Sequence, residues 1–136
     1  MKTLIIGKNS FFATKFKVLK NSKSISHKAF KKEKLLNYDK IILLSMPNFY
    51  KTKISKIKFE KEIFQKIKDK KIIYFSTSLV YPNKLNNKEN DIRPQNFYAK
   101  NKIKVENEIK KNFENFLIIR APIVFNKKKF SKNSFF

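Results

Sequence analysis

The sequence of 136 residues contains no cysteine, no tryptophan, one glycine and one histidine. Without cysteine, the chain forms neither disulfides nor thiolate metal sites. The single histidine, His27, has too few partners to complete a zinc site, which needs three or four protein ligands. No apolar run approaches the roughly 18 residues of a membrane span, and the run after Lys2 is too short for a signal-peptide core. These absences predict a cytoplasmic protein with no metal and no membrane partner.

Arginine and acidic residues are also scarce. The chain has 31 lysines but only two arginines, 10 acidic residues and a formal net charge of +23. This charge makes a basic nucleic-acid-binding protein without catalysis an alternative function. However, arginine is the preferred residue for bidentate contacts to bases and phosphates, and the lysines are spread evenly. Lys, Asn, Ile and Phe together supply 78 of 136 residues, a bias typical of an AT-rich genome. We therefore expect non-specific attraction to polyanions at low salt and no specific nucleic-acid partner.

Apolar runs and helical patterns alternate along the chain. Strands are expected at 3–6, near Ile25, and at 41–44, 72–75 and 117–119. Helices are expected at 11–19, 29–36, 57–70 and 96–113, with a polar, asparagine-rich loop at 82–94. On the last helix, Val105, Ile109 and Phe113 are predicted to form the buried face. This alternation predicts one α/β domain over residues 1–136, built on a parallel sheet.

Tyr98 and Lys102 are separated by four residues within the last predicted helix, so their side chains share one helix face. A nearby ammonium group favours the phenolate form of a tyrosine and lowers its pKa from about 10. A tyrosine tuned in this way can pass a proton to or from a sugar or alcohol oxygen. Because lysine is so abundant here, the pair alone is more typical of an ordinary solvated helix face, and only the order of the segments around it favours the functional interpretation.

Five segments around this pair follow one another in a recognisable order. They are Thr3–Ala13 with its glycine, Asp39–Ser45, the Ser-Thr-x-x-Val-Tyr block that ends at Tyr81, the Pro-x-x-x-Tyr-x-x-x-Lys block from Pro94 to Lys102, and the Arg-x-Pro strand from Phe116 to Phe125. This order resembles the extended short-chain dehydrogenase/reductase family of sugar-nucleotide epimerases, dehydratases and dTDP-4-dehydrorhamnose reductases. The resemblance implies a Rossmann-type parallel sheet flanked by helices, NAD or NADP as cofactor, and a nucleotide-sugar substrate.

The resemblance also assigns cofactor-binding residues. Gly7, Ser10 and Ala13 stand at the three glycine positions of the family's phosphate-binding turn, where the backbone must turn tightly, approach the pyrophosphate and pack closely. Ser10 departs most from that pattern, since its side chain would either crowd a phosphate or hydrogen-bond it. The backbone of Phe11 and Phe12 would contact the pyrophosphate. The alternative is a strand–turn–helix without a ligand.

In the same way, the resemblance assigns catalytic roles to three residues. Thr77 would bond the reacting oxygen, Tyr98 would be the acid/base, and Lys102 would lower the pKa of Tyr98 and hold the ribose of the cofactor. Read alone, Thr77 is as well explained as a capping hydroxyl, and Ser76 and Ser78 compete with it. The family's 4,6-dehydratases carry an Asp-Glu pair directly after the threonine. This chain has Ser78 and Leu79 there, which argues for reduction or epimerisation.

Other positions depart from the family or remain ambiguous. Ser45 ends a strand where the family places small residues over the cofactor. Arg120 either begins the path into the substrate half or pairs with Glu106 or Glu114 at the surface. The segment between residues 20 and 39 is compressed, and the acidic residue that selects NAD has no clear counterpart.

The chain also ends soon after the last predicted strand, so we expect a domain truncated after about residue 125 that lacks the C-terminal substrate lobe. A separate chain or a homodimer would then complete the site. A degenerate, non-catalytic partner subunit is a further alternative.

Overall fold

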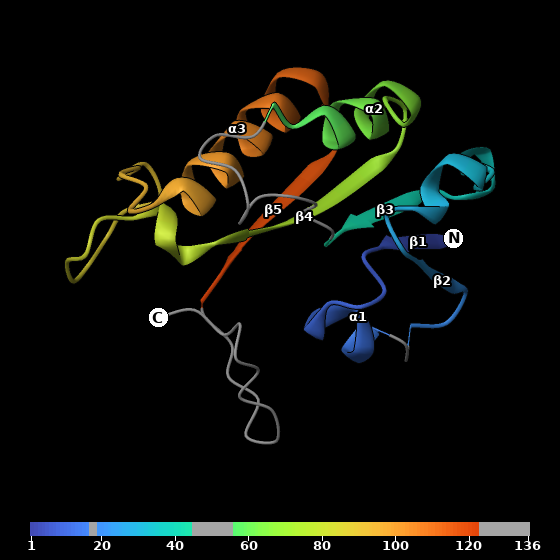
Figure 1. Cartoon of the computed structure of the whole chain (residues 1–136), viewed down its shortest axis with the longest axis horizontal. Coiled ribbons are helices and arrows are strands. Elements are labelled where there is room, and N and C mark those ends of the chain that lie inside the picture. Colours follow the sequence, from blue (N-terminus) through green and yellow to red (C-terminus); the bar gives the residue numbers. More distant parts are fainter. Residues whose placement is uncertain (17–18, 45–55, 123–136) are drawn as a thin grey trace.

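A computed structural model describes residues 1–16, 19–44 and 56–122, and they form a five-stranded sheet in which all neighbouring strands are parallel (Figure 1). The strand order is β2-β1-β3-β4-β5. The strands are β1 (Thr3–Ile6), β2 (Ser22–Ile25), β3 (Lys40–Leu43), β4 (Lys71–Thr77) and β5 (Phe116–Ala121). The α-helices are α1 (Phe11–Lys15), α2 (Lys58–Lys66) and α3 (Phe97–Asn112). The Rossmann-type α/β fold expected from the sequence is thus confirmed.

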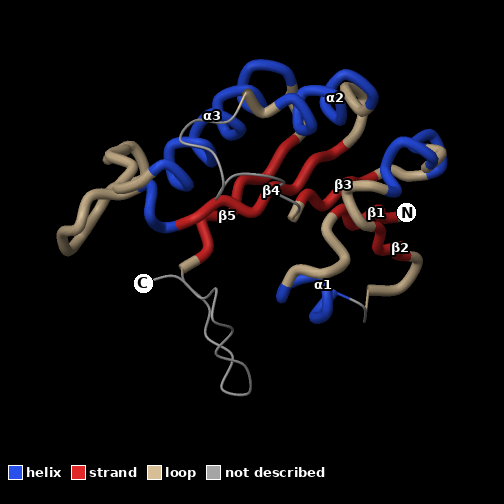
Figure 2. Tube along the Cα trace, viewed as in Figure 1, coloured by secondary structure: helices blue, strands red, loops and turns tan. Residues whose placement is uncertain are grey.

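Helices cover both faces of the sheet. Figures 1 and 2 show α2 and α3 side by side on one face, with α1 on the other. The larger core lies under α2 and α3, where Ile63, Ile72, Val105 and Ile109 are fully buried. Continuous apolar strands such as Leu4 to Ile6 suit this arrangement, because a parallel sheet buries both of its faces.

The direction of the chain changes at β1. From β1 the chain moves outward to β2, then returns to the other side of β1 to form β3, β4 and β5. Open parallel sheets bind ligands at such a switch point, outside the carboxyl ends of the strands. The carboxyl ends of β1 and β3 therefore mark the switch point where a site is expected.

The helix predicted at 96–113 is confirmed, since α3 covers Phe97–Asn112. Asn96 has extended backbone and its side chain accepts a hydrogen bond from the amide of Ala99 at 2.8 Å, which caps the helix. Val105, Ile109 and Phe113 are 0, 0 and 4% exposed, as their helical spacing predicts. The segment from Tyr81 to Asn96 contains neither helix nor strand, in agreement with the predicted loop.

Three helix predictions need correction. The helix that begins at Phe11 ends at Lys15 instead of residue 19, because the ring of Phe16 packs on Phe75 and the chain turns at Asn21, where φ is 57°, to enter β2. The predicted helix at 29–36 is instead two short 3₁₀ turns, Ala29–Lys32 and Leu35–Asn37. The helix predicted at 57–70 ends four residues early, at Lys66, because the chain turns at Ile67, whose carbonyl accepts from the amide of Lys70, to enter β4.

The second correction has a local cause. Glu33 has extended backbone between the two turns, and its carboxylate accepts hydrogen bonds from the hydroxyl of Tyr38 at 2.6 Å and the ammonium of Lys23 at 2.9 Å. These contacts hold Glu33 toward β2 and interrupt the helical path. Tyr38 is itself buried, and desolvation together with Glu33 raises its pKa to about 12.

Within the described ranges, no helix is both long enough and apolar enough to cross a membrane.

Candidate functional site at the carboxyl edge of the sheet

The turn after β1 has the geometry that a glycine provides. Gly7 has φ of 118°, a value that favours glycine, and its amide and that of Lys8 donate to the carbonyl of Ile25 at 2.8 and 3.0 Å. Ser10 caps α1, since its hydroxyl oxygen accepts from the amide of Ala13 at 3.1 Å. Ala13 is 1% exposed and packs against the face of the sheet that α1 covers.

This turn also places aromatic residues beside β4. The ring of Phe12 packs on that of Phe75 with centroids 4.8 Å apart. Phe11 begins the helix as expected. Ser45, the remaining residue of the predicted cofactor site, lies outside the described residues.

Thr77 is the last residue of β4 and is 6% exposed. Its hydroxyl oxygen accepts from the amide of Leu79 at 3.3 Å, so the capping interpretation is realised in this structure. A hydroxyl that accepts one bond can still donate its hydrogen to a ligand. The neighbouring hydroxyl of Ser76 is buried and has no hydrogen-bond partner among the described residues, so Ser76 remains a competitor.

Lys102 is buried against β4. It is 1% exposed, and its ammonium donates to the carbonyl of Phe75, two residues before Thr77. The same ammonium lies 4.7 Å from the ring centroid of Tyr74 and 5.6 Å from that of Tyr98. Tyr98 itself is half-buried on the larger core. The predicted Tyr-Lys pair therefore faces the carboxyl end of β4 and is no ordinary solvated helix face.

Burial and two carboxylates have opposite effects on the pKa of Lys102. Burial lowers the pKa of Lys102 to about 7, while Glu60 and Glu106 act in the opposite direction. Glu60 is 1% exposed, and burial raises its pKa to about 7 against the attraction of Lys102. One oxygen of Glu60, Oε1, has no hydrogen-bond partner among the described residues.

Sequence reasoning missed Glu60, although a signal was present. The buried stripe of α2 runs through positions 60, 63, 64 and 67, at helical spacing. A carboxylate on that stripe is unusual, because an acidic residue is rarely buried without a partner.

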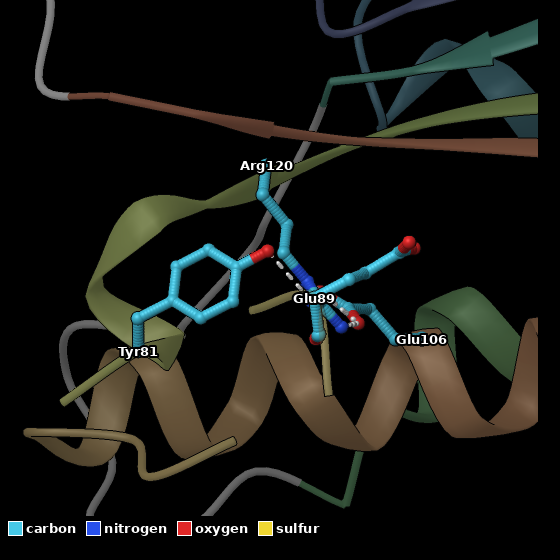
Figure 3. Close-up of polar contacts among 4 residues, drawn as sticks. All are labelled: Tyr81, Glu89, Glu106 and Arg120. Atoms are coloured by element: carbon cyan, nitrogen blue, oxygen red, sulfur yellow. Dashed lines mark hydrogen bonds and ion pairs between the residues drawn. The ribbon is translucent and has the colours of Figure 1, made fainter. Parts of the chain in front are cut away.

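Arg120 is the second feature whose role the sequence left open. Its side chain, 9% exposed, donates through Nε and Nη2 to the carboxylate of Glu106, with the shortest distance at 2.7 Å (Figure 3). Its Nη1 donates to the hydroxyl of Tyr81 at 2.9 Å and to the carbonyl of Glu89 at 2.7 Å. Of the alternatives considered, the pair with Glu106 is realised, but Glu106 is buried and Arg120 is half-buried, so the pair is not an exposed one.

The sheet brings the predicted residues to one edge in two groups. The Gly7 turn follows β1, whereas Thr77 ends β4 and Lys102, one helical turn from Tyr98, contacts β4 at the Phe75 carbonyl, and β3 lies between β1 and β4. No cluster of three or more metal-ligating side chains occurs in the described ranges.

Comparisons with solved structures identify the fold. A dTDP-4-dehydrorhamnose reductase from Bacillus anthracis, in complex with NADP, has 14% sequence identity and a TM-score of 0.72, with 93% of this chain and 55% of that one covered. A UDP-N-acetylglucosamine 4-epimerase from Methanobrevibacter ruminantium has 15% identity and a TM-score of 0.72, covering 99% and 59%. A dTDP-4-dehydrorhamnose reductase from Clostridium acetobutylicum has 19% identity and a TM-score of 0.61, covering 93% and 55%.

These likenesses define a Rossmann-type domain, and the chain spans just over half the length of each of these proteins. A search of curated protein sequences found no match. The family model described as the RmlD substrate binding domain matches residues 61–136, more than half of the chain. The chain therefore belongs to that family.

Proposed function

We propose that this chain is the dinucleotide-binding part of a sugar-nucleotide reductase or epimerase. It would bind NAD or NADP at the Gly7 turn and use Thr77, Tyr98 and Lys102 at the reacting end. The observation that carries the proposal is the contact between Lys102 and the Phe75 carbonyl, because it ties the Tyr-Lys helix face to the end of β4. Solved structures of similar fold were determined with NADP or NAD, which supports the choice of cofactor.

The residues at the turn fit a dinucleotide in two respects. Gly7 has the positive φ that lets the chain turn directly after β1, and Ala13 leaves α1 close to the sheet. The hydroxyl oxygen of Ser10 is engaged in capping the helix, so its hydrogen would be the group that meets a phosphate oxygen. Ser10 would thereby assist binding in spite of its departure from glycine.

Each catalytic group would have a distinct task. The bound nicotinamide would supply or accept a hydride at a sugar carbon. Tyr98 would hold or release the proton at the sugar oxygen, and Thr77 would orient that oxygen. Lys102 would favour the ionised form of Tyr98 by its charge, and since an ammonium has three donors, the bond to Phe75 leaves others for ribose hydroxyls.

The whole reaction requires a surface for the sugar nucleotide. Because the chain spans 55–59% of the lengths of the three proteins compared above, we propose that a second chain or a second copy completes the substrate site. Structures of similar fold in complex with UDP-N-acetylmuramic acid or UDP-glucuronic acid support a nucleotide sugar as the substrate class.

Calorimetric titration with NADH and NADPH at physiological salt tests the proposal. We expect binding by the wild-type protein, and Lys102→Ala should weaken it roughly tenfold or more, because one charge-assisted hydrogen bond is lost. Lys110→Ala is the matched control, since Lys110 is exposed near the other end of α3. Tripolyphosphate should compete poorly, which separates a built site from attraction to the basic surface. Absence of binding at millimolar cofactor by folded protein would refute the proposal.

A further inference from the structure

Arg120 occupies an unusual position for this chain. It is one of only two arginines, while lysine fills the other 31 basic positions. Its guanidinium contacts three separate parts of the fold, namely α3 through Glu106, the end of the 3₁₀ turn Ser78–Val80 through Tyr81, and the following loop through Glu89 (Figure 3). A lysine ammonium could not supply this fork, because its donors radiate from a single atom.

The contacts of Arg120 converge on the proposed site. Arg120 lies opposite Ser76 in the register of β4 and β5, one residue from Thr77. Glu106 follows Lys102 by one helical turn, and Lys102 follows Tyr98 by another, so the three side chains share one face of α3. One guanidinium thus connects the strand beside Thr77 to the helix face that carries Tyr98 and Lys102.

Glu106 lies between two cations. It accepts three hydrogen bonds from Arg120, and it also attracts the ammonium of Lys102. A buried carboxylate that loses its partner is strongly unfavourable and recruits the nearest remaining cation. Without Arg120 that cation would be Lys102, whose ammonium now contacts the Phe75 carbonyl and lies over the ring of Tyr98.

We propose that Arg120 is a positioning residue that occupies Glu106 and so leaves Lys102 free to face Tyr98 and β4. A second effect of the same fork is to hold the loop at Glu89 against the helix. The inference rests on the proposed function for its catalytic consequence, whereas the arrangement of Lys102 and Tyr98 can be measured without any cofactor.

The experiment compares four variants by NMR of protein with labelled tyrosine rings, under conditions where each is folded. In Arg120→Met, we expect the Tyr98 resonance to move, because Lys102 turns toward Glu106. In the double variant Arg120→Met with Glu106→Gln, the resonance should return toward its wild-type position, because the competing carboxylate is gone. Arg93→Met is the matched control, since Arg93 is the other arginine and is exposed.

Arg120→Lys separates the two effects. It keeps a charge beside Glu106, so the Tyr98 resonance should stay near its wild-type position. It loses the bonds to Tyr81 and Glu89, so amide hydrogen exchange at 91–93 should accelerate roughly tenfold, while β1 and β3 are unchanged. NADPH affinity should fall in Arg120→Met and recover in the double variant.

Two results would overturn the inference. One is an unmoved Tyr98 resonance in folded Arg120→Met. The other is a moved resonance that the second substitution does not restore, which would indicate general loss of packing. If the wild-type protein binds no cofactor, the proposed function fails, but the resonance of Tyr98 still decides the role of Arg120.

Discussion

At the scale of single residues, the proposed site depends on charges buried beside one strand. Lys102 is within contact distance of a backbone carbonyl and two aromatic rings, and the groups that set its charge come from two helices. Glu60 approaches from α2 and Glu106 lies on α3, where Arg120 from β5 already pairs with it. Burial has the largest effect on both groups, while Lys102 acts to lower the pKa of Glu60 and Glu60 acts to raise the pKa of Lys102.

This arrangement predicts an unusual pH dependence of stability. Burial raises the pKa of Glu60 from 4.5 to about 7, so the folded protein binds this proton more tightly than the unfolded chain does. The contribution of Glu60 to the free energy of unfolding therefore falls as pH rises from about 4.5 to 7. Burial lowers the pKa of Lys102 from 10.5 to about 7, so the contribution of Lys102 to the free energy of unfolding rises as pH increases from about 7 to 10.5.

Glu60→Gln should remove the first of these effects. We expect the variant to be more stable than wild type at pH 7, by about 1–3 kcal/mol, and the difference to shrink toward pH 5. Glu62→Gln is the control, because Glu62 lies on the same helix but pairs with Lys66 near the surface. Urea denaturation at several pH values measures the difference, and parallel profiles for wild type and Glu60→Gln would contradict the role of burial.

At the scale of elements, local sequence signals determined some boundaries and not others. Asn96 and the apolar positions along α3 predicted that helix, because a cap and a helical stripe agree. The segment at 29–36 also has helical composition, but contacts of Glu33 with Lys23 and Tyr38 favour extended backbone there. Such contacts depend on where β2 lies, and no local pattern reveals them.

Helix α3 should be sensitive to its cap. Asn96→Ala removes the bond to the Ala99 amide and should lower the free energy of unfolding by about 1 kcal/mol. Asn107→Ala is the matched control, because Asn107 is exposed within the same helix, where alanine has the better helical propensity. Chemical denaturation measures both variants. Equal losses for the two would mean that Asn96 has no special role.

At the scale of the whole molecule, the order of strands and helices was readable from the sequence because buried parallel strands are nearly continuous apolar runs. The same reading located Tyr98 and Lys102 on one helix face. It could not reveal that Lys102 is buried, that Glu60 attracts the Lys102 ammonium, or that Arg120 pairs with the buried Glu106. Those facts depend on how α2, α3 and β5 pack together, which sequence spacing does not specify.

The charge of +23 belongs to this scale as well. We predict that the protein binds DNA or RNA at low salt and releases it near physiological salt, since evenly spread lysines give non-specific attraction. Fluorescence anisotropy across a salt series measures this. Sequence-selective binding that persists at physiological salt would favour a nucleic-acid function over the one proposed here.

The most direct test combines cofactor binding with the identity of the site. The chain has five tyrosines, so protein labelled at tyrosine rings gives few signals, and Tyr98→Phe assigns the relevant one. On titration with NADPH at physiological salt, we predict a saturable shift of the Tyr98 resonance, while that of Tyr38, which packs near β2, stays in place. Saturable binding that leaves Tyr98 unmoved, or no binding at all, would contradict the proposed dinucleotide site.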